Sequence, residues 1–158
     1  MSALETQEAV QTLEVAREEV IAAPIDVVFE TILEQIGPDN ETPDGTPLPM
    51  KIEPWPGGRW FRDLGHNTGH LWGHVQAIKA PNRIEIYGPL FMSTPAMSNV
   101  QYRLIAEGNG TRLKFCHRAI GWTLPEHRDG SKIDSGWGSL LARVKAKAEQ
   151  KRRRENLV

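Results

Sequence analysis

The segment Ser135-Gly136-Trp137-Gly138-Ser139-Leu140-Leu141-Ala142-Arg143-Val144-Lys145 lies near the C-terminus and predicts a long amphipathic helix. Apolar residues in and around it recur at spacings of three and four, which is the period of one helical face. They are Ile133, Trp137, Leu140, Leu141, Val144 and Ala148. A helix of roughly 20 residues is about 30 Å long, which is enough to cross a small domain. Because most of the remaining chain predicts short strands, we expect a sheet to wrap around this helix and bury its apolar face.

Composition and charge restrict the classes of function. The chain has 158 residues and a formal net charge of -1, which gives no general attraction to nucleic acid. Its one cysteine, Cys116, cannot form an internal disulfide, and no segment is apolar and long enough for a signal peptide or a membrane span. We therefore expect a cytoplasmic protein without a nucleic-acid partner or membrane span. Its oligomeric state is not predicted. Residues 1–12 are expected to form a flexible N-terminal segment, and residues 13–155 a single domain.

The first part of the chain predicts a strand, a helix and a long loop. Residues 13–22 are rich in β-branched side chains, which favours a strand. Pro24 then suits the first turn of a helix, and an apolar stripe follows until Gly37 and Pro38 end it. The proline-rich loop (residues 37–50) contains four prolines, a composition that forbids a regular element of any length. Such a loop is either a lid over a site or a tolerated insertion, and the sequence leaves both open.

The middle of the chain changes to a period of two, which is typical of half-buried strands. Strands are predicted at residues 51–55, 59–64, 70–80, 83–87, around 100–104, and at 111–119, with short turns between most of them. Sequential strands joined in this way form an antiparallel meander, so the fold class is α+β. The last two strands share an apolar, inward face made of Val100, Tyr102, Leu104, Leu113, Phe115 and His117.

Three histidines recur every four residues, at His66, His70 and His74. On a helix they would align as metal ligands, but in a turn followed by a strand only His70 and His74 share a face, with Trp72 between them. We therefore expect no metal site. The chain also lacks a Gly-Lys-Ser or Gly-Lys-Thr sequence, so we expect neither a phosphate-binding loop nor any other cofactor.

His117 is set apart by its predicted place on the inward face. A buried imidazole needs hydrogen-bond partners, so His117 is either a satisfied core residue or a polar group in a pocket. It could act as a general base, but no carboxylate or nucleophile that would act with it is recognisable, and no Gly-x-Ser-x-Gly elbow occurs. No catalytic residue is therefore assigned.

The five tryptophans raise the question of a cavity. They either fill the core or line a space left between a curved sheet and the helix, and the sequence alone leaves both readings open. Gly136 and Gly138 flank Trp137 at the start of the long helix. Because glycine inside a helix costs about 1 kcal/mol relative to alanine, these two indicate a close approach of backbone to sheet or a bent helix start.

Several short motifs resemble one superfamily when they are taken in order. The segments 21–29 (Ile-Ala-Ala-Pro-Ile-Asp-Val-Val-Phe), 56–60 (Pro-Gly-Gly-Arg-Trp), 110–117 (Gly-Thr-Arg-Leu-Lys-Phe-Cys-His) and 136–141 (Gly-Trp-Gly-Ser-Leu-Leu) resemble the START-like, polyketide-cyclase-related superfamily (SRPBCC). The nearest branch is that of the activator of heat-shock-protein ATPase. The resemblance implies a helix-grip fold, in which a curved antiparallel sheet holds a long C-terminal helix over a cavity. Members bind lipids, polyketides or hormones, act as cyclases, or assist a chaperone. The proline-rich loop departs from the pattern, because a short second helix is expected there.

We expect a binding protein rather than an enzyme, with a small hydrophobic or aromatic molecule held between the curved sheet and the C-terminal helix. The first alternative is an interaction module whose partner is a chaperone, with a role in the stress response. The second is a cyclase- or hydrolase-type enzyme that uses the same cavity. His117 and Tyr102 are the expected polar groups of the lining. The full expected lining is Trp60, Tyr102, Phe115, His117, Trp137 and Leu141.

Overall fold

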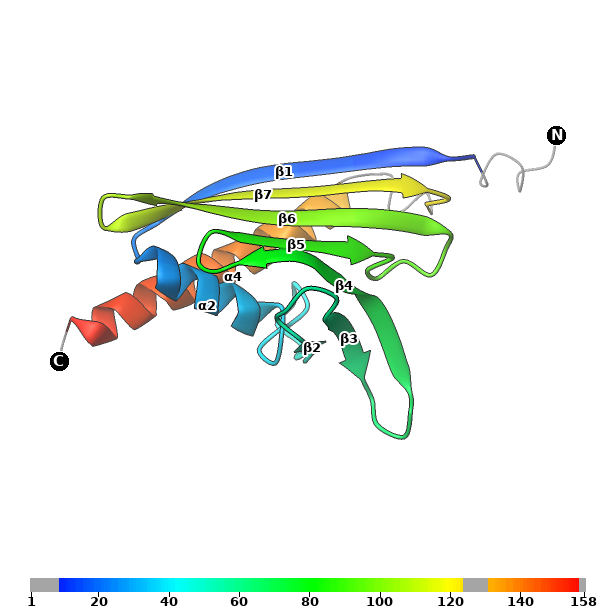
Figure 1. Cartoon of the computed structure of the whole chain (residues 1–158), viewed down its shortest axis with the longest axis horizontal. Coiled ribbons are helices and arrows are strands. Elements are labelled where there is room, and N and C mark those ends of the chain that lie inside the picture. The colour runs from blue at the N-terminus through cyan, green and yellow to red at the C-terminus, as the bar shows by residue number, and fades with distance from the viewer. Residues whose placement is uncertain (1–8, 124–130, 157–158) are drawn as a thin grey trace.

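One curled antiparallel sheet forms the body of the protein (Figure 1). The computed structural model describes residues 9–123 and 131–156, so residues 1–8 of the expected N-terminal segment lie outside the described residues. Seven strands pair in the order β1-β7-β6-β5-β4-β3-β2. They are β1 (Gln11–Ile21), β2 (Lys51–Ile52), β3 (Arg59–Asp63), β4 (Gly69–Lys79), β5 (Arg83–Gly88), β6 (Ala96–Glu107) and β7 (Gly110–Gly121). The predicted α+β class and antiparallel meander are confirmed, and β1 closes the order by pairing with β7.

In the described part of the chain, two helices cover one face of this sheet. The long helix α4 (Ser131–Glu155) crosses the face on a diagonal, and α2 (Ile25–Gln35) lies beside it (Figure 1). The inward face of β6 and β7 is buried as predicted, because alternate residues of a strand point to one side. The predicted stripe of α4 is buried against it: Ile133, Trp137, Leu140, Leu141, Val144 and Ala148 are each at most 7% exposed.

The two glycines of α4 have different surroundings. A Cβ at Gly138 would lie 2.8 Å from the guanidinium of Arg17, which crosses the helix from β1 to pair with Asp134 at 2.9 Å. Gly138 therefore leaves room for the Arg17 side chain, and its contact is with this side chain and not with the backbone of the sheet. A Cβ at Gly136 would meet no atom within 4 Å, so this glycine borders open space instead.

The α2 helix ends at a contact with the sheet. Pro24 is its N-cap and Ile36 its C-cap, and the indole Nε1–H of Trp60 donates to the Ile36 carbonyl at 2.7 Å. The proline-rich loop that follows contains no helix or strand, only an isolated bridge between Glu41 and Pro47. This agrees with its composition.

A bulge in β4 changes which side chains share a face. Trp60 pairs with Gly73 but Phe61 pairs with Leu71, so Trp72 is an extra residue in the ladder. His70, which accepts a hydrogen bond from the Trp72 indole, and His74, which stacks on Tyr87, therefore lie on different sides of the sheet. The expectation that His70 and His74 share a face is wrong for this reason.

The described helices carry no membrane span, since none is both long and apolar enough to cross a bilayer.

Candidate functional site

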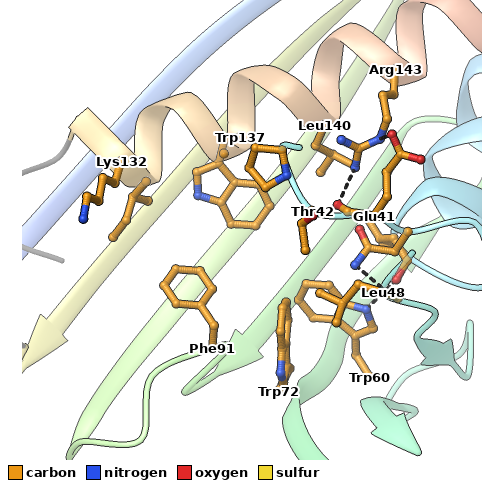
Figure 2. A pocket seen from close by; sticks show the side chains of 15 residues that line it. Glu41, Thr42, Leu48, Trp60, Trp72, Phe91, Lys132, Trp137, Leu140 and Arg143 are labelled. Carbon is orange, nitrogen blue, oxygen red and sulfur yellow. Dashed lines mark hydrogen bonds and ion pairs between the residues drawn. The ribbon is translucent and has the colours of Figure 1, made fainter. Parts of the chain in front are cut away.

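A cavity of about 410 Å³ lies between the N-terminal half of α4, the proline-rich loop and the β3–β4 end of the sheet (Figure 2). In Figure 2 the Trp137 indole approaches it from the helix, and three aromatic side chains approach it from the sheet side. Its lining is predominantly apolar and consists of Ile36, Asn40, Glu41, Thr42, Pro43, Leu48, Trp60, Trp72, Phe91, Lys132, Ile133, Gly136, Trp137, Leu140 and Arg143.

The sheet side of the cavity is an aromatic cluster. The rings of Trp60 and Trp72 meet edge to face at 5.1 Å, and those of Trp72 and Phe91 do so at 5.9 Å. Both tryptophans have a bonded indole N–H: Trp60 donates to the Ile36 carbonyl, and Trp72 donates to Nδ1 of His70 at 3.2 Å. With their polar atoms engaged, the rings present carbon surface to the cavity.

The helix side of the cavity depends on a glycine beside a large ring. Gly136 leaves open space where any other residue would place a Cβ. Trp137, one position further on, is only 7% exposed and packs on Phe115 at 4.7 Å between ring centres. Gly136 and Trp137 therefore both line the cavity from the helix side.

A buried chain of hydrogen bonds holds the Trp137 ring. Its Nε1–H donates to Nδ1 of His117 at 3.0 Å, and the His117 Nε2 lies 2.9 Å from the hydroxyl of Ser98. Because Nδ1 accepts, the imidazole is neutral and carries its proton on Nε2, which donates to Ser98. Burial lowers the pKa of His117 from 6.5 to about 4, which keeps this arrangement intact at neutral pH.

The His117 ring has no exposed surface, and both of its nitrogens are engaged. It therefore offers no free nitrogen to a molecule in the cavity, and it does not have the geometry of a general base. His117 is therefore not placed to act directly on a molecule in the cavity.

One end of the cavity is polar. Arg143 of α4 donates from Nε to the Gln35 side chain at 3.3 Å, from Nη1 to Ser139 at 3.1 Å, and from Nη2 to the Glu41 carbonyl at 3.2 Å. Its Nε is also 3.7 Å from the Glu41 carboxylate. Burial lowers the pKa of Arg143, and Glu41 only partly offsets this. Arg143 thus ties the proline-rich loop to both helices.

Of the six side chains expected to line the cavity, the structure brings Trp60 and Trp137 to it. Tyr102, Phe115, His117 and Leu141 lie behind them in the packed core, each at most 2% exposed. The space under the middle of α4 is filled because Tyr102 and Phe115 pack ring to ring at 5.2 Å beneath it. The cavity therefore lies toward the start of the helix.

Tyr102 is not a polar group of the cavity. Its hydroxyl is buried without a hydrogen-bond partner in the described part of the chain, and burial raises the pKa of this phenol above its ordinary value. The ring serves as core packing, and the hydroxyl is an unsatisfied group.

Sequence reasoning missed most of the remaining lining. Trp72 is turned toward the cavity by the bulge in β4, which no alternation of residue types indicated. Phe91 comes from the connection between β5 and β6, and Asn40, Thr42 and Leu48 come from the proline-rich loop. The four prolines of this loop were the one available signal, and they indicated a loop without deciding between a lid and a tolerated insertion.

Among residues 9–123 and 131–156, no three His, Cys, Asp or Glu side chains are grouped so that they could hold a metal ion. His70 and His74 are instead engaged by Trp72 and Tyr87.

Comparison with known proteins places the chain among proteins of the same fold. The sequence model of the family described as "Activator of Hsp90 ATPase homolog 1-like protein" matches residues 22–149. A putative uncharacterized protein from Rhizobium leguminosarum is similar in structure, with a TM-score of 0.66 and 19% identity over 90% of this chain and 97% of that one. A protein from Nitrosomonas europaea is similar with a TM-score of 0.63 and 15% identity, over 89% and 96% of the two chains. A protein from Chromobacterium violaceum has a TM-score of 0.63 and 17% identity, over 86% and 96%. At these identities the likeness shows the fold. No curated protein matches the sequence.

Proposed function

The chain belongs to the family of Activator of Hsp90 ATPase homolog 1-like proteins, and on that premise we propose that it binds a small hydrophobic or aromatic molecule without catalysing a reaction. The site is the cavity between the proline-rich loop, α4 and the β3–β4 end of the sheet. The observation that carries the proposal is the open space at Gly136 facing a cluster of aromatic rings.

The size and chemistry of the cavity suit such a ligand. Its volume of about 410 Å³ falls within the roughly 300–1,000 Å³ that is usual for small-molecule sites. Ring faces and edges from Trp60, Trp72, Phe91 and Trp137 would contact a planar molecule on two sides. An apolar molecule that enters this space would remove the apolar ring surfaces from water, which favours its binding.

Gly136 gives a selective test. Gly136→Leu places a side chain in the open space, whereas Gly136→Ala adds a single methyl group and serves as the matched control. Both replacements favour a helix over glycine, so neither is expected to unfold the protein. The wild-type protein is titrated with indole, flavonoids, steroids and fatty acids while tryptophan fluorescence is followed.

We expect a saturable fluorescence change with at least one class of compound, retained in Gly136→Ala and lost or weakened at least about tenfold in Gly136→Leu. A panel without any response would remove the proposal. Equal affinity in wild type and Gly136→Leu would show that the ligand binds elsewhere.

A chaperone is the second candidate partner, and the description of the matching family supports it. If the chain acts on a heat-shock-protein ATPase, its addition should raise the hydrolysis rate of that chaperone. Because a docking surface does not need the cavity, Gly136→Leu should stimulate as well as wild type. An unchanged rate together with no co-purification of the two proteins would exclude this candidate.

A further inference from the structure

A second hollow shares no lining residue with the aromatic cavity. It has a volume of about 950 Å³ and is formed by both ends of the proline-rich loop, β2 and the β3–β4 hairpin. Its apolar lining residues are Pro38, Met50, Ile52, Phe61 and Leu71, and charged side chains from β3 and from residues 51–53 lie among them. The proposed function makes no use of this hollow.

The charges in this hollow do not balance. Its lining contains the cations Lys51, Arg59 and Arg62 and the carboxylates Glu53 and Asp63. Lys51 pairs with Asp63 at 2.7 Å, and Arg59 pairs with Glu53 at 2.8 Å. Both carboxylates are therefore paired, and Arg62 is the one of these three cations that has no carboxylate partner in the lining.

Each oxygen of the two carboxylates already accepts at least one hydrogen bond. Glu53 receives Arg59 on both oxygens, at 2.8 and 2.9 Å. Asp63 receives Lys51 on one oxygen at 2.7 Å and the Gly65 backbone N–H on the other at 2.9 Å. Arg62 Nη1 forms a hydrogen bond with neither group.

Arg62 is half-buried, and its Nη1 is fully shielded from solvent with no acceptor among the described residues. A shielded guanidinium N–H without an acceptor costs free energy, and a planar oxyanion is the group that best matches its fork of donors. His70 is the direct partner of Arg62 in the β3–β4 ladder. Because His70 Nδ1 accepts the Trp72 indole N–H, its Nε2 carries the proton and adds a second donor to the hollow.

We propose that this hollow is a binding site for a small organic anion. Arg62 binds the carboxylate or phosphate group, the His70 Nε2–H assists, and the apolar part of the ligand packs against Ile52, which pairs with Trp60 and so lies on the same face of the sheet as Arg62 and His70. The site has donors to offer and its carboxylates are already paired, which selects an anion over a cation or a neutral polar molecule. This proposal does not depend on whether the aromatic cavity binds a ligand.

Three probes with one phenyl ring test it: benzoate, phenyl phosphate and the neutral benzamide. Binding is followed by backbone amide chemical shifts, with Gly65, Thr68 and Gly69 as reporters beside the hollow. The variant is Arg62→Gln, which removes the charge but keeps a polar side chain of similar length. The matched control is Arg103→Gln, an exposed arginine on β6 that lies outside the hollow.

We expect at least one of the two anions to bind, benzamide not to bind, and Arg62→Gln to weaken the anion about 10- to 100-fold. Arg103→Gln should bind like wild type, and raising the salt concentration should weaken binding. The stronger anion identifies the group as carboxylate or phosphate. The proposal is overturned if neither anion shifts the reporters at 10 mM, a concentration at which millimolar affinity is readily seen, or if Arg62→Gln binds as well as wild type.

Discussion

Acidification should weaken the fold through one buried ring. The His117 imidazole is neutral, with Nδ1 accepting from Trp137 and Nε2 donating to Ser98. If Nδ1 were protonated, its N–H and the Trp137 Nε1–H would be two hydrogen-bond donors facing each other in a buried site. Burial lowers the pKa of His117 from 6.5 to about 4 in the folded protein. As the pH falls below 6.5, His117 is protonated in the unfolded chain but stays neutral in the folded chain. The free energy of unfolding therefore falls as the pH drops from about 6.5 toward about 4.

The size of the effect follows from the two pKa values. A shift from 6.5 to about 4 corresponds to about 3 kcal/mol when titration is complete, and about 2 kcal/mol of it is lost between pH 7.5 and pH 5.0. Carboxylates respond at lower pH. Hydrogen bonds from Arg59 lower the pKa of Glu53 from 4.5 to about 2, so its contribution is lost only below that interval.

Urea denaturation followed by far-ultraviolet circular dichroism at pH 7.5, 6.5, 5.5 and 5.0 measures the effect. His117→Gln is the control, because its amide can accept from Trp137 and donate to Ser98 but does not titrate. Wild type should lose about 2 kcal/mol relative to this variant over the series, and all other histidines contribute equally to both proteins. Parallel curves for the two proteins would refute the reasoning, since the pH dependence would then originate elsewhere.

Three further changes test individual contacts. Tyr102→Phe removes a buried hydroxyl that has no partner in the described chain, so the free energy of unfolding in urea should stay the same or rise by up to about 1 kcal/mol; a loss of more than about 1 kcal/mol would reveal a missed partner. Gly136→Ala should stabilise by about 1 kcal/mol in the same assay, and Gly138→Ala by less, because the guanidinium of Arg17 must move away from the new methyl group; equal gains would contradict the close approach. Arg143→Gln should speed hydrogen exchange of the proline-rich loop by at least about fivefold without changing exchange in β6 and β7; a uniform increase would mean global rather than local destabilisation.

The sequence was sufficient for the fold because its strongest signals are periodic. The stripe on α4 repeats over four turns, and the strands β6 and β7 alternate over most of their length, so single exceptions do not change the result. The predicted ends of the strands differ more from the observed ones than the positions of the strands do. The first residues of β6, from Ala96 to Asn99, were expected to be mostly loop, because Pro95 and Ser98 are typical of turns. Pairing with β7 extends the strand through them.

The site was less predictable because it depends on non-periodic features. One extra residue at Trp72 changes the face of every side chain between it and the β3–β4 turn, and nothing in the local residue types reports that insertion. Whether the space under a helix is filled depends on the summed volumes of side chains from several strands. Tyr102, Phe115 and Leu141 had the right parity to point inward, but parity does not distinguish a residue that lines a space from one that fills it.

The place of His117 in the core has a physical reason beyond packing. A leucine or phenylalanine there would avoid the cost of burying an imidazole, but the Trp137 Nε1–H would then be buried without an acceptor. Such an orphan donor costs about 1–3 kcal/mol, enough to favour rotamers that turn the indole toward water. The nearest open volume is the cavity that Trp137 borders, so the ring would swing into it and close it. On this argument the bond from Trp137 to His117, anchored on β6 by Ser98, keeps the largest side chain of α4 against the sheet. The open space beside Gly136 therefore depends on a residue that does not touch it.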